Sequence, residues 1–388
     1  MTRFTVASYH VIRRRRGRVV HSSAMGRVAY IVSSHGFGHA ARACAVMAEM
    51  HLRCSSIHFE VFTEVPKWFF SESLPDCFSY HRFASDVGLV QRSPLIEDLE
   101  ATGDLLDQKR CDDPVTVGQL AATLRRLGSS VVIADISPFG LAAAAKAGIP
   151  SVLVENFTWD WVYLNYPDGP SRLRRHGRRM VEIFASAKLR IQTDPVCEPS
   201  PTAESVGPVA RSPRSERETV RASLGVPADE PMMVVSMGGV PWNYGDFADF
   251  DHSDGAWIVV PGGSERVAHR RGRLLMLPFH SDSYHPDLVA ASDLVVSKLG
   301  YSTVAESYHA GAALAYVGRP RFPESPILAR WVEEHMVAAE IGEDSLRNGA
   351  WLAVGNELLE IPRRKPEGPN GAVRAAAVIL EKFGPLIG

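Results

Sequence analysis

The sequence predicts an α/β protein with two similar domains, each built around a parallel β-sheet, whose sheets face a central cleft. Short apolar runs end in loops rich in Gly and Ser and are followed by helical sequence, as in strand–loop–helix units. This pattern stops over residues 194–214, which are dense in Pro, Ser and charge, and then begins again. Because ligands bind beyond the carboxyl ends of parallel strands, two facing domains would bind ligands between them.

Length and composition exclude several other classes of protein. The 388 residues suit two or three domains, and 42 basic against 44 acidic residues give no cationic face for nucleic acid. No apolar stretch is long enough for a transmembrane segment. Five scattered cysteines without a C-x-x-C pair indicate reduced thiols. We therefore expect a cytoplasmic protein with small-molecule partners, and the sequence leaves its oligomeric state open.

The chain divides into five expected parts. The first carries a basic run, Arg13 to Arg16, without the apolar region of a secretion signal, so it is either a disordered basic tail or a misassigned start before Met25. A C-terminal helix ends the chain and could cross back to the N-terminal domain. The expected parts are the tail 1–24, the N-terminal domain 25–195, the linker 196–214, the C-terminal domain 215–365 and the helix 366–388.

Apolar runs give the expected strands of the two sheets. The first half has them at residues 28–32, 57–62, 131–134 and 151–154. The second half has them at residues 232–236, 257–260, 294–297 and 313–317. These runs are apolar throughout, as expected of parallel strands that helices cover on both faces.

The segment Ser34–Arg42 follows the first strand and is the densest local signal. His35, Gly36, Gly38 and His39 place two imidazoles beside backbone that a ligand can approach closely. A neutral imidazole can accept a proton near neutral pH, so either histidine is a candidate general base. The alternative is a tight turn with a capping histidine. A zinc site is not expected, because two histidines are too few ligands.

The same loop also fits a short dinucleotide-binding pattern. Gly36-x-Gly38-x-x-Ala41 has the required spacing, and Glu64 ends the second strand where a ribose-binding acid could lie. The pattern is short and common. It keeps an NAD-dependent oxidoreductase open as a less favoured function.

Asp135 ends the third strand of the same half. A carboxylate at this edge of the sheet could orient the imidazole of His39 and stabilise its protonated form. The alternative is that Asp135 caps the helix or turn that begins at Ser137-Pro138. Downstream, Trp159 and Trp161 belong to an aromatic cluster at a strand end, which predicts either core packing or a stacking wall for an acceptor.

In the second half, Gly300-Tyr301-Ser302-Thr303 stands at a strand-to-helix turn. The unsatisfied N–H groups and the dipole of a helix N-terminus favour a diphosphate. Glu306, one turn later, could hold ribose hydroxyls or could form a capping box with Thr303. Gly238 and Gly239 could supply further amides. Asp249-Phe250-Asp251 spells D-x-D, which we interpret as a solvated loop, so no metal site is expected.

Several segments, in this order, carry a resemblance to a known family. They resemble the GT-B glycosyltransferases, and most of all the GT-B-like N-terminal half of L-arabinokinase and its stand-alone bacterial relatives, over about residues 25–383. The segments are Ser34-His35-Gly36-Phe37-Gly38-His39-Ala40-Ala41-Arg42, Asp135-Ile136-Ser137-Pro138, Asn156-Phe157-Thr158-Trp159-Asp160, Tyr284 to Asp293, Lys298 to Glu306, and Asn370-Gly371-Ala372.

The resemblance implies the GT-B fold, with two Rossmann-like domains whose parallel sheets face a cleft. It implies an inverting, metal-independent glycosyltransferase without a cofactor, whose substrates are a nucleotide-diphosphate sugar and a small-molecule acceptor. His39 matches the catalytic base and Asp135 the acid that pairs with it. Two other functions stay open: a non-catalytic module that binds nucleotide sugars, and a sugar-nucleotide 2-epimerase.

The resemblance also implies binding residues in both halves. Glu324 lies where a donor sugar is held, although this chain has Glu-Ser where the family commonly has Asp-Gln or Gln-Gln. From the sequence patterns and the resemblance together, the residues expected to bind the donor are Gly238, Gly239, Phe279, His280, Gly300, Tyr301, Ser302, Thr303, Glu306 and Glu324. Those expected to bind the acceptor are His35, Phe37, Trp159 and Trp161.

Overall fold

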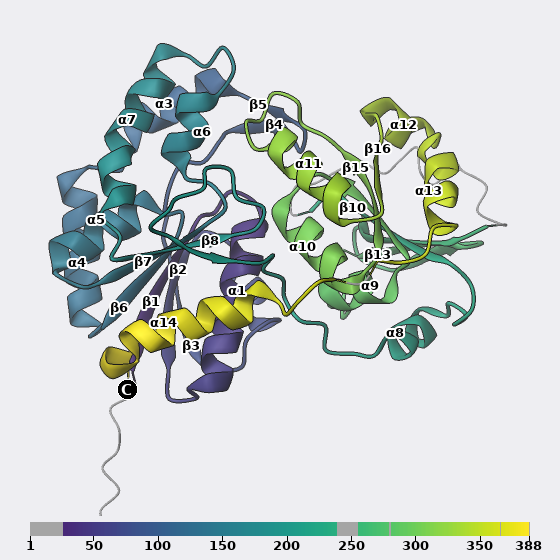
Figure 1. The fold of residues 1–388 in the computed structure, drawn as a ribbon, viewed down its shortest axis with the longest axis horizontal. Helices are drawn as coiled ribbons and strands as arrows, with labels where there is room; N and C mark the ends of the chain where they lie inside the picture. The colour runs from purple at the N-terminus through teal and green to yellow at the C-terminus, as the bar shows by residue number, and fades with distance from the viewer. Residues whose placement is uncertain (1–25, 239–254, 279–280, 365, 388) are drawn as a thin grey trace, which may run out of the picture.

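The computed structural model describes residues 26–238, 255–278, 281–364 and 366–387, which form two α/β halves (Figure 1). The first half contains β1 (Arg27–Val32), α1 (Gly38–Arg53), β2 (His58–Thr63), α2 (Lys67–Ser71), β3 (Phe78–Arg82), β4 (Gln91–Ser93), β5 (Ile96–Glu97), α3 (Leu99–Gln108), α4 (Pro114–Arg126), β6 (Val131–Asp135), α5 (Pro138–Ala147), β7 (Ser151–Glu155), α6 (Trp159–Asn165), α7 (Ser171–Ala185), β8 (Leu189–Thr193) and β9 (Glu204–Val206). The second half contains α8 (Arg217–Leu224), β10 (Met232–Ser236), β11 (Trp257–Ser264), β12 (His269–Arg271), β13 (Leu274–Pro278), α9 (His285–Ala291), β14 (Leu294–Lys298), α10 (Tyr301–Ala310), β15 (Ala313–Val317), α11 (Ser325–His335), β16 (Ala338–Glu340), α12 (Glu343–Asn348), α13 (Trp351–Leu359) and α14 (Gly371–Ile387).

Each half is built on a twisted sheet whose central strands are parallel. The N-terminal sheet has the order β3-β2-β1-β6-β7-β8-β9, and all of its pairs are parallel. The C-terminal sheet has the order β12-β13-β11-β10-β14-β15-β16, and its edge strand β12 is antiparallel to β13. The predicted fold class, two parallel-sheet α/β domains, is confirmed.

The strands at the sheet centres are those that the sequence predicts. Most strands nearer the edges carry polar residues and are not predicted, and the apolar β13 is also missed. In β8, Arg190 and Gln192 both bind the buried carboxylate of Glu155 on β7, so a polar sequence forms an interior strand. The expected linker 196–214 contains β9, which pairs with β8. The N-terminal sheet therefore extends to Val206.

The last helix, α14, packs on the N-terminal half although the chain reaches it from the C-terminal half (Figure 1). Its apolar face includes Ala375, Ala376, Ile379 and Phe383, which are buried in the same core cluster as β1, β2 and α1. Chain segments therefore cross between the halves twice, once after β9 and once before α14. Both crossings keep the carboxyl ends of the two sheets facing each other.

The sequence leads us to expect reduced cysteines and no transmembrane segment, and the structure bears on both. All five cysteines are described, and no disulfide joins them. Among the described residues, no helix combines the length and apolar character needed to cross a bilayer.

Candidate active site

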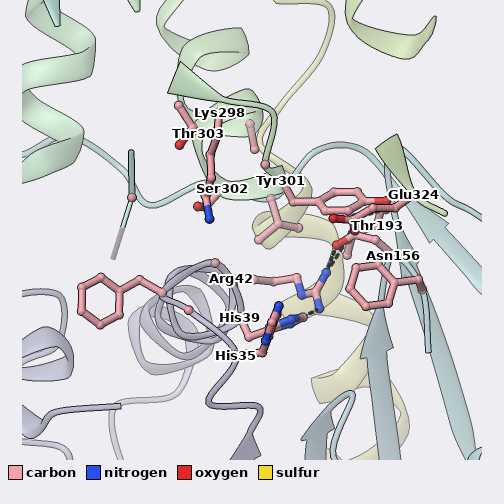
Figure 2. A pocket seen from close by; sticks show the side chains of 18 of the residues that line it. His35, His39, Arg42, Asn156, Thr193, Lys298, Tyr301, Ser302, Thr303 and Glu324 are labelled. Carbon is pink, nitrogen blue, oxygen red and sulfur yellow. Dashed lines mark hydrogen bonds between the residues drawn. The ribbon is translucent and has the colours of Figure 1, made fainter. Parts of the chain in front are cut away.

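A cavity opens between the two halves, at the carboxyl ends of both sheets. Its volume is about 920 Å³ when the open solvent at its mouth is included. Figure 2 shows His39 and Arg42 on one side of this cavity and Lys298, Ser302 and Thr303 on the other. A second hollow adjoins it, because Phe37, Gly238, Ser302 and Thr303 line both.

The structure brings His39 and Asp135 together, although 96 positions separate them. Strands β1 and β6 are neighbours, and Val32 at the end of β1 is in register with Asp135 at the end of β6. His39 is the second residue of α1, which begins just beyond β1. Its Nδ1 lies 2.9 Å from Oδ1 of Asp135. The order of the strands therefore creates the pair.

Arg42 completes this cluster and was not singled out from the sequence. It follows His39 by three positions on α1, so both side chains leave the same helix face. Its Nε and Nη2 lie 2.8 and 2.6 Å from the two oxygens of Asp135, and its Nη1 donates to Asn156. Thr193, at the end of β8, lies 3.4 Å from the same Nη1.

These contacts keep Asp135 ionised. Burial by itself would raise the pKa of this carboxyl, but the charge of Arg42 and the hydrogen bonds from Arg42 and His39 lower the pKa below its ordinary value. Asp135 is fully buried, so the Arg42 guanidinium provides the opposite charge that it requires.

The same contacts assign the proton on His39. Its Nδ1 is 2.9 Å from the carboxylate of Asp135, which accepts, and 3.2 Å from Nη2 of Arg42, which can only donate. The contact with Asp135 is the shorter, so we assign the proton to Nδ1. Nε2 is then unprotonated, and this histidine lines the cavity.

Asp135 is not the cap of the helix that follows it. Ser137 occupies that position, and its Oγ accepts from the N–H of Gly140 while it donates to the carbonyl of Ser85. Ile136, between the two, has φ 48°, a conformation that costs free energy in a β-branched residue. The turn therefore leaves the Asp135 carboxylate available to His39 and Arg42.

His35 lies in the loop before α1 and lines the cavity. Its Nδ1 accepts a weak hydrogen bond from the N–H of Leu89 (3.4 Å), and its ring stands edge-on to Trp159, with 5.2 Å between centroids. Burial, and then the nearby His39, Arg319 and Lys298, keep the pKa of His35 well below its ordinary value. His35 is therefore neutral near pH 7.

Of the other residues expected to bind the acceptor, one lines the cavity and two do not. Phe37 is half-buried, lines the cavity and packs on Trp68 and Phe69 of α2. Trp159 is fully buried behind His35, and its indole donates to Asp86, so it is not in the cavity wall. Trp161 is half-buried against the N-terminal core and is not in the wall either.

Across the cavity, α10 presents an open N-terminus. Its N-cap is Gly300, which has no side chain to bond the first N–H groups of the helix. The expected capping box is not formed, because Thr303 lies inside the helix and Glu306 is its sixth residue. Tyr301, Ser302 and Thr303 line the cavity, and the hydroxyl of Tyr301 lies 3.1 Å from the sulfur of Cys197 in the other half.

Lys298, at the end of β14, points into the cavity beside α10. Its ammonium forms no ion pair or hydrogen bond with another described residue. Burial and the nearby charge of Arg319 lower its pKa to about 7, with Glu324 opposing the shift. Gly238, at the end of β10, comes close to it: a Cβ at that glycine would lie 3.6 Å from Cε of Lys298.

Arg319 and Glu324 form a buried ion pair at the cavity, with Nη2 2.5 Å from Oε1. Oε2 of Glu324 and Nε of Arg319 are buried without a hydrogen-bond partner among the described residues. Burial raises the pKa of Glu324 despite the opposing charges of Arg319, His39 and Lys298. The pair therefore has spare hydrogen-bonding capacity toward a ligand.

Glu306 lies at the second hollow with both carboxylate oxygens engaged. Arg211 Nε is 3.0 Å from Oε1, and His285 Nδ1 is 2.9 Å from Oε2. Burial opposes ionisation, but the charge of Arg211 and the contacts with His285 lower the pKa of Glu306 below its ordinary value. Arg211 comes from the expected linker, and its guanidinium also lies over the rings of Phe69 and Tyr284.

Some predicted residues cannot be placed. Gly239, Phe279, His280 and the D-x-D segment Asp249–Asp251 lie outside the described residues. Among the residues that are described, no group of three or more His, Cys, Asp or Glu side chains could hold a metal ion.

Comparison with known proteins agrees with this architecture. No protein-family model matches the chain. L-arabinokinase of Arabidopsis thaliana is 28% identical over 367 residues, which are 91% of this chain and 34% of that protein. An uncharacterized glycosyltransferase of Methanopyrus kandleri is 22% identical over 275 residues, 66% of this chain and 76% of that one. The chain thus spans about a third of the length of the arabinokinase.

Solved structures with the same fold are glycosyltransferases. A UDP-glucosyltransferase from Polygonum tinctorium, capable of glucosylating indoxyl, superposes with a TM-score of 0.59 at 13% identity, over 94% of this chain and 100% of the other. The chain therefore has the glycosyltransferase-like GT-B fold, and the resemblance predicted from its sequence is confirmed.

We predict that Asp135→Asn lowers the free energy of unfolding by about 3–5 kcal/mol, because it leaves the buried Arg42 charge without its partner. Since the folded pKa of Asp135 is depressed, its contribution is complete at pH 7 and is lost only as pH falls through that lowered value. Urea unfolding at pH 7 measures it. Exposed Asp76→Asn is the control, and Asp135→Asn with Arg42→Met should regain part of the loss. A single variant no less stable than the control would contradict the prediction.

We predict that the affinity for a nucleoside diphosphate falls between pH 7 and pH 9, by up to about tenfold per pH unit. Lys298 has a pKa of about 7 without ligand, so it is largely neutral at pH 8 and must take up a proton to pair with the diphosphate. Calorimetric titration at several pH values measures this. Lys298→Met should bind more weakly with a flatter profile, whereas exposed Lys109→Met should follow the wild type. The same slope in Lys298→Met would assign the dependence to another group.

Proposed function

We propose that the chain is an inverting, metal-independent glycosyltransferase that moves a sugar from a nucleotide-diphosphate donor to the hydroxyl of a small-molecule acceptor. One observation carries the proposal: a histidine oriented by a buried carboxylate faces, across one cavity, the uncapped N-terminus of a helix. The first can remove a proton, and the second can hold a diphosphate.

The N-terminal half supplies the base. Nε2 of His39 would take the proton of the acceptor hydroxyl as its oxygen attacks the anomeric carbon. The imidazolium that forms would be stabilised by Asp135, which stays ionised throughout. Arg42 is a positioning residue in this scheme, because it fixes both oxygens of Asp135.

The C-terminal half supplies the leaving-group site. The first N–H groups of α10, the hydroxyls of Ser302 and Thr303 and the ammonium of Lys298 would take the negative charge that grows on the diphosphate as the sugar–oxygen bond breaks. The two faces of the cavity then act on opposite sides of the anomeric carbon. A single displacement of this kind inverts its configuration.

Glu306 and Glu324 are the proposed contacts of the ribose and of the donor sugar. Glu306 lies at the adjoining hollow, held in place by Arg211 and His285, so its orientation is fixed before a ribose arrives. Glu324 keeps one oxygen without a partner among the described residues. A sugar hydroxyl could donate to that oxygen.

The similar proteins support a glycosyltransferase without naming its substrates. The Methanopyrus relative and the Polygonum protein are both named as glycosyltransferases. The arabinokinase is named for a different activity, and this chain covers only 34% of it. The residues of the cavity therefore support the proposed donor and acceptor.

The alternatives differ in what they leave unexplained. A module that only binds nucleotide sugars needs the α10 site but gives no use for a histidine oriented by a carboxylate. A 2-epimerase would use the same base on the sugar, and product analysis separates it from a transferase. For a nicotinamide enzyme, the candidate ribose acid Glu64 is largely exposed and lies 3.7 Å from Arg82 at the surface.

We predict that His39→Ala lowers turnover of a nucleotide sugar by roughly 10²–10⁴-fold, the usual contribution of positioned proton transfer. Nucleotide affinity should stay within a few-fold, because the other half of the protein binds it. Release of nucleoside diphosphate measures turnover, and calorimetry measures affinity. His269→Ala, at an exposed histidine on β12, is the control. Full turnover by His39→Ala would exclude His39 as the base.

We predict that nucleoside diphosphate binding is unchanged by EDTA. The described residues offer cations and helix N–H groups for the diphosphate rather than a metal cluster. Calorimetry with and without excess EDTA measures the affinity. Binding that collapses in EDTA and returns with manganese would instead point to the D-x-D segment.

A further inference from the structure

The two halves exchange side chains across the cleft beside His39. Phe322, from the loop after β15, is 2% exposed and belongs to the core of the N-terminal half. Its ring stacks at 6.5 Å on His35 and stands edge-on to Tyr166 at 6.1 Å. In return, Leu95, between β4 and β5, packs on the core of the C-terminal half. Phe322 therefore forms part of the cavity wall beside His35.

Several aromatic rings near His39 are packed on one another. Trp159 is fully buried, and Phe157 is 5% exposed with its ring packed on Trp159 and Tyr301. Phe322 occupies the space against His35 that a flat ring would otherwise enter. Phe157 and Phe322 both line the cavity, but each is at most 5% exposed, so little of their surface is open to a large aromatic acceptor.

Polar groups without a protein partner also line the cavity. From the N-terminal half, Gln91 and Asp194 line the cavity, and neither side chain forms a hydrogen bond or ion pair with a described residue. From the C-terminal half, Oε2 of Glu324 is buried at the cavity without a partner in the described part of the chain. Carboxylate oxygens accept hydrogen bonds from hydroxyl groups, and a side-chain amide both donates and accepts.

The charges of the wall argue against an anionic acceptor, because the acids and cations of the wall are matched before a diphosphate takes up Lys298. The wall carries two acids, Asp194 and Glu324, and two bases, Lys298 and Arg319. The charge of Arg42 is neutralised by Asp135, which lies behind the wall. With a diphosphate on Lys298 and α10, no cation without a counter-charge remains on the acceptor side of the described residues.

We propose, resting on the function proposed above, that the acceptor is a small neutral polyhydroxylated molecule, a sugar or a cyclitol, held by Asp194 and Gln91 beside His39. One of its hydroxyl oxygens bonds to the anomeric carbon of the donor, and the hydroxyl proton passes to Nε2 of His39. The bond from that carbon to the diphosphate oxygen breaks, and the nucleoside diphosphate leaves with the electron pair.

The test compares acceptors on the full-length protein. A panel of pentoses, hexoses and myo-inositol is set against quercetin and indoxyl, each with a set of nucleotide sugars, and products are identified by mass. We expect transfer to a member of the first group, with kcat/KM at least tenfold above that for either aromatic compound. Preferred transfer to quercetin or indoxyl would overturn the inference while leaving the glycosyltransferase standing.

Variants test the assigned residues. Asp194→Asn and Gln91→Ala should each raise KM for the polyol by roughly 10- to 100-fold, the effect of losing hydrogen bonds to a buried polar or charged group. Donor affinity should not change. Asp76→Asn and Gln108→Ala, which remove the same groups from the exposed surface of this half, should match the wild type. Unchanged KM in both cavity variants would overturn the assignment.

Direct binding separates this inference from the proposed function. Calorimetry with the same polyols and a saturating nucleoside diphosphate needs no turnover. If no nucleotide sugar is consumed but a polyol binds and Asp194→Asn weakens it, the site stands and the transferase does not. If no polyol binds to the wild type, the inference fails.

Discussion

The paired charges of Asp135 and Arg42 are the constraint on which the N-terminal half of the site depends. Both side chains are buried, and a buried charge is tolerated only with a partner of opposite sign. The guanidinium also reaches Asn156 and Thr193 at the ends of β7 and β8. One ion pair therefore ties α1 to the carboxyl ends of three strands, and His39 is held in place by the same atoms.

A similar cluster lies in the other half, again with one acid, one arginine and one histidine. Glu306 binds Arg211 and His285, as Asp135 binds Arg42 and His39. The two clusters differ in extent. The Asp135 cluster lies within the N-terminal half. Arg211 of the Glu306 cluster comes from a segment that crosses between the halves, and its guanidinium lies over the ring of Phe69 in the N-terminal half. A nucleotide that contacts Glu306 would therefore act on the packing between the halves as well as on its own site.

The sequence predicts the parts of this site that are local and misses those that need the fold. His39 could be found because glycines and histidines cluster after an apolar strand, and Asp135 because it ends one. That they meet depends on β1 lying next to β6, which spacing does not reveal. Arg42 looks like an ordinary helix residue, and Arg211 and β9 lie in a stretch whose composition is that of a linker. Phe322 has no periodic context, so nothing local indicates that it crosses the cleft.

The donor side of the cavity holds two groups, and burial destabilises the charged form of each. Burial lowers the pKa of Lys298 and raises that of Glu324, so the empty site disfavours the charged form of each. A diphosphate at α10 would restore the charge of Lys298, and sugar hydroxyls would satisfy the unpartnered oxygen of Glu324. Glu324 is paired with Arg319 through one oxygen only. Asp135 and Glu306 differ, because partners already contact both oxygens of each carboxylate. Asp135 and Glu306 thus have their partners within the protein, whereas Lys298 and Glu324 have polar atoms that a bound ligand would pair.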